Sequence, residues 1–226
     1  MSKRIIICVL VIFVLGLTAC DKKTSDKNVS TEDKKNDVSK NIDISTIDES
    51  NIEYSYGAAD MNVYNPSCEE LSEKADIIFK GKLVESESYL NEQATINSDY
   101  TFVVSESYKG DVGSEVSINM LCGIMEKSLF VKQVMKHDGY EQSEIDKVEE
   151  EPGKYIAFGL EGFNPLDLNE EYVIYAKYHP EHDYYYPVYY FYGVYEQNDN
   201  GEYERYGLDE NDKQIKKIEE LVECIK

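Results

Sequence analysis

The sequence has few positive charges and no long apolar run. Asp and Glu together number 45 against 23 Lys and Arg, which gives a net charge of -22 at pH 7. A surface this acidic repels the phosphates of nucleic acids, so we expect no nucleic-acid partner. The apolar stretch over residues 5–15 is too short to span a bilayer, since a transmembrane helix needs about 20 apolar residues.

The sequence also lacks the short motifs of common enzyme classes. It contains no Gly-x-Ser-x-Gly elbow, phosphate-binding loop, His-Glu-x-x-His pair or dinucleotide fingerprint. Acidic runs such as residues 149–151 lack the alternating ligands and central glycine of a calcium loop. We therefore expect a protein that is not an enzyme and that has no metal site or cofactor. A hydrolase that uses a pair of acidic side chains is the alternative.

The N-terminus has the order of parts of a bacterial secretion signal. Lys3 and Arg4 precede the apolar stretch, and residues 17–20 read Leu-Thr-Ala-Cys before an abruptly polar segment. A basic start, a short apolar core and small residues before a cleavage point are typical of a signal peptide. Residues 17–20 also resemble the lipobox of bacterial lipoproteins, in which the cysteine is lipidated and becomes the first residue of the mature chain.

This resemblance implies a lipid-anchored protein. Residues 1–19 would be the signal peptide, cleaved between Ala19 and Cys20, and Cys20 would carry a diacylglyceryl anchor. Two acyl chains give stable attachment where one chain is marginal, which would place the protein at the extracellular face of the cell membrane. The alternative is an ordinary signal peptide with an incidental cysteine, which would leave a freely secreted protein.

The rest of the chain divides into a polar stalk and a folded domain. Residues 21–40 contain only Val29 and Val38 as apolar side chains, so this segment cannot bury enough surface to offset its chain entropy. We expect the lipidated cysteine and a disordered stalk over residues 20–60 and one folded domain over residues 66–226.

Three cysteines remain after the signal and the lipidated residue: Cys68, Cys122 and Cys224. An extracellular compartment permits disulfides, and three thiols allow one bridge and one free cysteine. We predict the bridge between Cys68 and Cys122. None of the three lies in a Cys-x-x-Cys pair, which argues against a redox centre or a zinc knuckle.

Alternating apolar residues predict a domain that is mainly β-structure. Ser67 and Glu70 form a capping-box pattern that predicts a short helix to residue 74, before the first strand. Strands are expected at residues 77–84, 100–105, 115–121, 154–160, 171–178 and 202–206, with Gly81 marking a bulge or a close approach. The pattern from Asn211 and Gln214 onward predicts an amphipathic C-terminal helix. We expect a small OB-like barrel, closed or partly open, with these flanking helices.

Four segments carry a family resemblance: residues 67–71, 75–84, 100–104 and 108–110. Together with residues 154–158, they resemble the OB-fold module of tissue inhibitors of metalloproteinases and of netrin C-terminal domains. The animal inhibitors chelate the protease zinc through the free amine of an N-terminal cysteine. Cys68 lies inside the mature chain, so the resemblance implies the scaffold but not that mechanism.

The densest aromatic segment, residues 184–195, supplies the candidate ligand-binding residues. If the segment is one strand, four tyrosines share a face and can stack on a sugar or a partner protein: Tyr184, Tyr186, Tyr190 and Tyr192. The alternative is that they only pair across the sheet. Two weaker candidates are the residues 179–183, with two imidazoles and two carboxylates, and His137, which we expect to be a cation at a helix end.

Taken together, these features predict a membrane-anchored extracellular binding module for a surface protein or a glycan. The alternative is an accessory or inhibitory protein for an extracellular enzyme.

Overall fold

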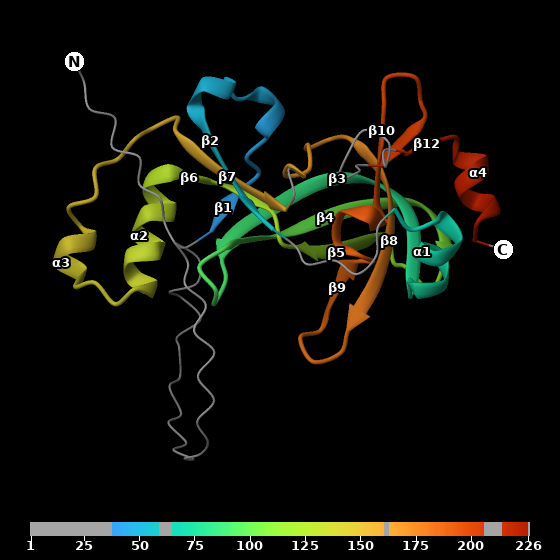
Figure 1. Ribbon diagram of the computed structural model, residues 1–226, viewed down its shortest axis with the longest axis horizontal. Coiled ribbons are helices and arrows are strands. Elements are labelled where there is room, and N and C mark those ends of the chain that lie inside the picture. Colours follow the sequence, from blue (N-terminus) through green and yellow to red (C-terminus); the bar gives the residue numbers. More distant parts are fainter. Residues whose placement is uncertain (1–37, 59–64, 161–162, 206–213, 226) are drawn as a thin grey trace, which may run out of the picture.

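The computed structural model describes residues 38–58, 65–160, 163–205 and 214–225. These ranges are mainly β-structure, with twelve strands and four α-helices, as the sequence predicted (Figure 1). Each α-helix within them is too short or too polar to cross a membrane. The expected signal peptide, Ala19 and Cys20 lie outside the described residues, and so does Asn211.

Five strands close a ring at the centre of the molecule. The ring runs in the order β3 (Ile77–Leu90), β4 (Ile96–Lys109), β5 (Glu115–Met120), β9 (Tyr184–Pro187) and β8 (Glu171–His179), and β8 pairs again with β3. Neighbours are antiparallel except β5 and β9, which are parallel and meet at the pair Ile118 and Tyr185. Five strands in a ring that is only weakly joined at one point resemble a small, partly open barrel. The predicted OB-like architecture is therefore present as a ring with a short seam between β5 and β9.

The remaining strands extend this ring or form a second sheet. β10 (Val194–Gln197), β11 (Tyr203–Arg205) and β12 (Gln214–Lys216) continue outward from β8. A three-stranded sheet is built from β2 (Ile52–Gly57), β7 (Tyr155–Leu160) and β6 (Gly123–Glu126), with β2 parallel to β7.

The folded part begins earlier in the chain than we predicted. β1 (Ser39–Lys40) pairs with β3, and β2 pairs with β7, although both lie within the expected stalk of residues 20–60. Ile52 of β2 packs on Ile124 and Ala157 in a small separate core. The predicted domain boundary at residue 66 is therefore wrong. The sequence does not show the pairing of β1 and β2, because their partners lie far along the chain.

The main core fills the ring with aromatic side chains. Phe102 of β4 packs edge-on against Phe79 and Tyr172, with ring centroids 5.6 and 5.8 Å away. A Cβ atom at Gly81 would lie 2.8 Å from the carbonyl oxygen of Val103, and the β3–β4 register shifts at the same point. The predicted bulge and close approach at Gly81 are confirmed, since only glycine fits between the two backbones.

The helices gather at opposite ends of the molecule. α1 (Cys68–Lys74) and α4 (Ile218–Glu223) lie at one end, and α2 (Lys127–His137) and α3 (Gln142–Ile145) lie at the other (Figure 1). The predicted capping box of α1 is confirmed, because Ser67 and Glu70 exchange hydrogen bonds of 2.8 and 3.2 Å. The C-terminal helix is shorter than predicted because Gln214 lies in β12.

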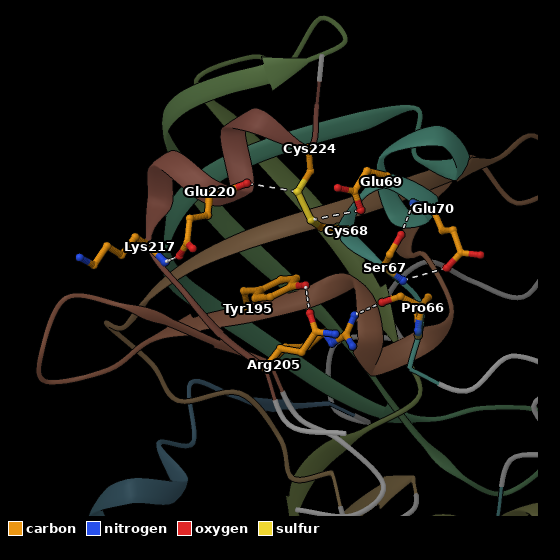
Figure 2. The surroundings of a disulfide bond; sticks show 11 residues. Pro66, Ser67, Cys68, Glu69, Glu70, Tyr195, Arg205, Lys217, Glu220 and Cys224 are labelled. Carbon is orange, nitrogen blue, oxygen red and sulfur yellow. Dashed lines mark hydrogen bonds between the residues drawn. A yellow bond between two sulfur atoms is a disulfide. The ribbon is translucent and has the colours of Figure 1, made fainter. Parts of the chain in front are cut away.

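A disulfide joins Cys68 of α1 to Cys224 at the end of α4 (Figure 2), with Cα atoms 5.7 Å apart. The predicted pairing of Cys68 with Cys122 is wrong. Cys122 is buried and free, beyond the end of β5 and next to the hydroxyl of Tyr100. The sequence gives no sign that the two terminal helices meet, because their contact depends on how the ring closes.

Arg205 of β11 makes a second set of long-range contacts at this end of the molecule (Figure 2). The side chain is 0% exposed, and its guanidinium donates hydrogen bonds of 2.6 Å to the Pro66 carbonyl and 2.5 Å to the Asn65 side-chain oxygen. It also lies between the rings of Tyr192 and Tyr195, at 5.1 and 5.6 Å from their centroids. These contacts connect β11 to the residues that lead into α1.

Candidate ligand-binding cleft

A cleft of about 580 Å³ lies beside the seam between β5 and β9. One wall comes from β9 and the residues after it, and the other from the β3–β4 turn, β4 and β5. The volume falls within the range of small-ligand sites, about 300–1,000 Å³. The cleft therefore lies where the ring is joined by the single residue pair Ile118 and Tyr185.

Tyrosines form the first wall. The alternation of β9 sends Tyr184 and Tyr186 to the cleft, whereas Tyr185 between them packs against the main core. The rings of Tyr184 and Tyr186 meet nearly at right angles, with centroids 6.4 Å apart. The backbone then leaves the strand at Pro187, which cannot donate to a ladder.

Tyr190 is brought to the same wall by an unusual backbone. Tyr189 and Tyr190 both have a left-handed conformation, with φ of 52° and 56°. Each such residue costs about 1–2 kcal/mol, and this strain is typical of functional sites where the surrounding structure enforces it. Tyr190 is 50% exposed and lines the cleft.

The predicted row of four tyrosines is therefore only partly present. Three of its members line the cleft: Tyr184, Tyr186 and Tyr190. Tyr192 does not, because the turn at Pro187 and the 3-10 helix Tyr190–Gly193 end the strand alternation. Its ring is 0% exposed and faces Arg205 in the core.

Asparagines form the opposite wall, joined by a ladder of amide hydrogen bonds. Asn91 donates to the side-chain oxygen of Asn97 (2.8 Å), and Asn97 donates to that of Asn119 (3.1 Å). Asn119 in turn donates to Asp99 (2.7 Å) and to the Tyr89 hydroxyl (2.8 Å). The register of β3, β4 and β5 sets Asn97, Asn119 and their partners close together, and Asn91 lies in the turn between β3 and β4, so the sheet fixes most of the polar wall.

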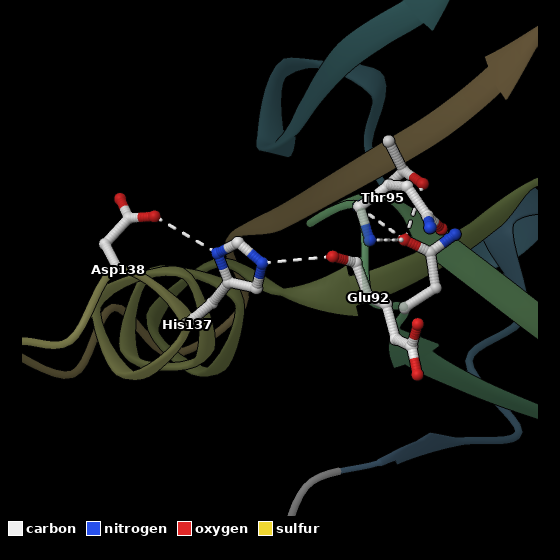
Figure 3. Close-up of polar contacts among 6 residues, drawn as sticks. Glu92, Thr95, His137 and Asp138 are labelled. Atoms are coloured by element: carbon white, nitrogen blue, oxygen red, sulfur yellow. Dashed lines mark hydrogen bonds and ion pairs between the residues drawn. The ribbon is translucent and has the colours of Figure 1, made fainter. Parts of the chain in front are cut away.

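The hairpin that carries Asn91 is held in place by α2 (Figure 3). His137, the last residue of α2, contacts the Glu92 carbonyl oxygen through Nε2 and the Asp138 carboxylate through Nδ1, both at 3.1 Å. The hydrogen bond to Asp138 raises the pKa of His137 above its usual value. His137 lies at the helix end as predicted, and its contact with Glu92 braces the asparagine wall.

The floor of the cleft is apolar and contains Cys122, Leu160 and Phe163. The Cys122 side chain is 1% exposed, and burial raises the pKa of its thiol to about 12. The thiol therefore stays protonated at neutral pH, and it is not a nucleophile, since the thiolate is the reactive form.

The segment 179–183 contributes rings to the tyrosine wall. His179 lies 5.4 Å from Tyr184, and His182 stacks on Tyr184 at 5.8 Å between centroids. The Asp183 carboxylate accepts a hydrogen bond of 2.6 Å from Tyr178. In the described parts of the chain, donor atoms of three potential metal ligands converge at Cys68, Glu69 and Cys224, where the two sulfurs form the disulfide.

The charge of the cleft differs from that of the whole protein. Lys74, Lys177 and His179 line it, but no aspartate or glutamate does so among the described residues. In the complete chain, acidic residues outnumber basic ones 45 to 23. The cleft is thus a basic and neutral region in an acidic protein.

A pair of carboxyl groups lies elsewhere, around the buried phenol of Tyr172. The Tyr172 hydroxyl is 3.1 Å from a Glu196 carboxylate oxygen and 3.1 Å from the Asp167 carbonyl oxygen, and it accepts from the Asp167 amide at 2.9 Å. Burial raises the pKa of Glu196 to about 7 and also raises that of Asp167. Neither residue lines the cleft.

Comparison with protein-family models, curated proteins and solved structures finds no match for this chain. The cleft must therefore be interpreted from its own residues. Sequence reasoning identified its tyrosines because they are concentrated in one segment, but it missed the asparagine wall. Those residues come from three places in the chain, and each is an ordinary polar residue in its local pattern.

Proposed function

We propose that this protein is a lipid-anchored module at the extracellular face of the membrane that binds a carbohydrate in the cleft between the tyrosine and asparagine walls. The anchor follows from the lipobox-like residues that end at Cys20. The cleft supports the binding role because its aromatic rings face hydrogen-bonding amides. Sugars need both, since their C–H faces stack on rings and their hydroxyls need polar partners.

One observation carries the proposal: Tyr190 is half exposed at the mouth of the cleft despite a strained backbone. A tyrosine that only stabilised the sheet would lie within a strand, in an unstrained conformation, with its ring covered. The lining also favours binding over hydrolysis. Its described residues supply no pair of carboxyl groups for acid–base chemistry on a glycosidic bond.

A glycan array followed by calorimetry tests the proposal. The probe is the chain from Asp21 onward, which omits only the signal and the lipidated cysteine, and the array displays neutral and acidic oligosaccharides. We expect a saccharide to bind, and Tyr190→Ala to weaken that binding by about tenfold, or ~1.4 kcal/mol, because one stacking surface is lost.

Tyr140→Ala is the matched control. Tyr140 is an exposed tyrosine in the segment between α2 and α3, outside the cleft lining, so its loss should leave the affinity unchanged. An array without any bound saccharide would contradict the proposal. So would equal affinities for wild type and Tyr190→Ala, or capture of a surface protein that Tyr190→Ala does not disturb.

A further inference from the structure

The charged side chains in the described lining of the cleft include two lysines and no carboxylate. We propose, on the basis of the proposed carbohydrate-binding function, that the ligand of the cleft is an acidic saccharide whose carboxylate is held by Lys74 and Lys177. Lys74 ends α1 and Lys177 lies in β8, and both line the same cleft.

The first argument is that neither ammonium group has a charged or hydrogen-bonded partner among the residues that the structure describes. Some lysines of the chain meet acidic partners, as Lys80 does with Glu106 at 2.7 Å and Lys127 with Glu53 at 2.6 Å, whereas others, such as the exposed Lys82, meet none within the described residues. Lys74 and Lys177 form no ion pair and no side-chain hydrogen bond with any residue in the described ranges. In a protein with a net charge of -22, two unpaired cations beside one cleft are positioned to meet an anion.

The second argument is the balance of hydrogen-bond donors and acceptors. The Asn91 side-chain oxygen accepts from the Gln93 amide and from both the amide and the hydroxyl of Thr95, at 2.9–3.0 Å. The side-chain oxygens of Asn97 and Asn119 accept from the preceding asparagine of the ladder. The side-chain oxygens of all three asparagines therefore already accept hydrogen bonds within the protein. The two ammonium groups add only donors, and a carboxylate only accepts.

The third argument excludes the opposite charge. Aromatic walls also attract cations such as quaternary ammonium groups, which sit over ring faces. Such sites need negative charge nearby, and the described lining of this cleft supplies lysines instead of carboxylates. The Asp99 carboxylate lies behind Asn119 and outside that lining. A cationic ligand would meet Lys74 and Lys177 with no carboxylate in the described lining to contact, so the tyrosines are left to stack on a sugar ring.

The test compares two ligands that have the same sugar rings and differ in whether their carboxyl groups are charged or esterified. An oligogalacturonic acid and its methyl ester share the same rings, and both are placed on the array with neutral oligosaccharides. We expect the acid to bind about tenfold more tightly than the ester. The variant with Lys74→Gln and Lys177→Gln should bind both forms equally, because its remaining contacts are those of a neutral sugar.

Lys82→Gln is the control, since Lys82 is an exposed lysine of β3 that does not line the cleft. It should keep the full preference for the acid. Binding of neutral and acidic saccharides with equal affinity, or a preference for the acid that survives the double lysine substitution, would overturn this inference and leave the proposed function standing. An array on which no saccharide binds would instead refute the proposed function and this inference with it.

Discussion

Breaking the disulfide with Cys224→Ser should strongly destabilise the protein. The bond joins residues 156 positions apart, and closing a loop of this length removes about 17 cal/mol/K of unfolded-chain entropy, or about 5 kcal/mol at 25 °C. Native disulfides usually contribute somewhat less than this limit, about 2–4 kcal/mol. We therefore expect the free energy of unfolding to fall by about 2–5 kcal/mol in Cys224→Ser.

The loss of structure in Cys224→Ser should begin at α4. This helix has six residues and is far too short to be stable alone, since isolated helices below about 12 residues are marginal. Its fully buried apolar contact is Leu221, whose burial contributes about 1.5–3 kcal/mol. Without the bond, ordering these residues costs more entropy than Leu221 offsets, so α4 should exchange its amide hydrogens much faster than the ring.

Urea unfolding followed by circular dichroism measures the effect. The slope rises with protein size, and a slope of about 2.5 kcal/mol/M converts the expected loss into a midpoint about 1–2 M lower. Dithiothreitol should lower the midpoint of the wild type to that of Cys224→Ser and should not move the variant further. An unchanged midpoint on reduction would refute the reasoning, as would a peptide map in which Cys68 is linked to Cys122.

Two further predictions concern buried polar groups. Glu196→Gln should flatten the pH dependence of stability: the raised pKa of Glu196, about 7, gives stabilisation that is complete below pH 4.5 and is lost as the pH rises through 7. This stabilisation amounts to up to about 3 kcal/mol. If the melting temperatures of wild type and Glu196→Gln change in parallel from pH 4 to pH 8, the prediction is contradicted. Arg205→Met should lower the free energy of unfolding by about 2–4 kcal/mol, because Pro66 and Asn65 lose their hydrogen-bond donors and the rings of Tyr192 and Tyr195 lose a cation. A urea midpoint within about 0.3 M of that of the wild type would contradict this stabilising role of Arg205.

Local patterns predicted the elements where they were strong. The capping box at Ser67 fixed the start of α1, and the alternation of apolar residues located β3, β4, β5 and β8. Gly81 was recognisable because a glycine inside a strand has few other reasons to be there. These features depend on neighbours within a few residues, which a sequence displays directly.

Long-range pairing was not predictable in the same way. β1 and β2 were missed, and the disulfide was assigned to the wrong partner, because each depends on a segment far along the chain. The same limit applied to the cleft. Tyr192 was placed on the wrong side because β9 ends at Pro187 and a 3-10 helix follows, and the left-handed backbone of Tyr189 and Tyr190 has no signature in residue order.

The sequence by itself thus determined the class of the fold, the positions of most strands and the unusual concentration of tyrosine near its C-terminal third. The tertiary structure decided which of those tyrosines face a ligand, that three asparagines stand opposite them, and that two lysines share the cleft with no acidic residue among the described lining. The physical reason is that side-chain orientation along one strand follows a period of two, whereas the meeting of two walls depends on how the ring closes at the seam between β5 and β9.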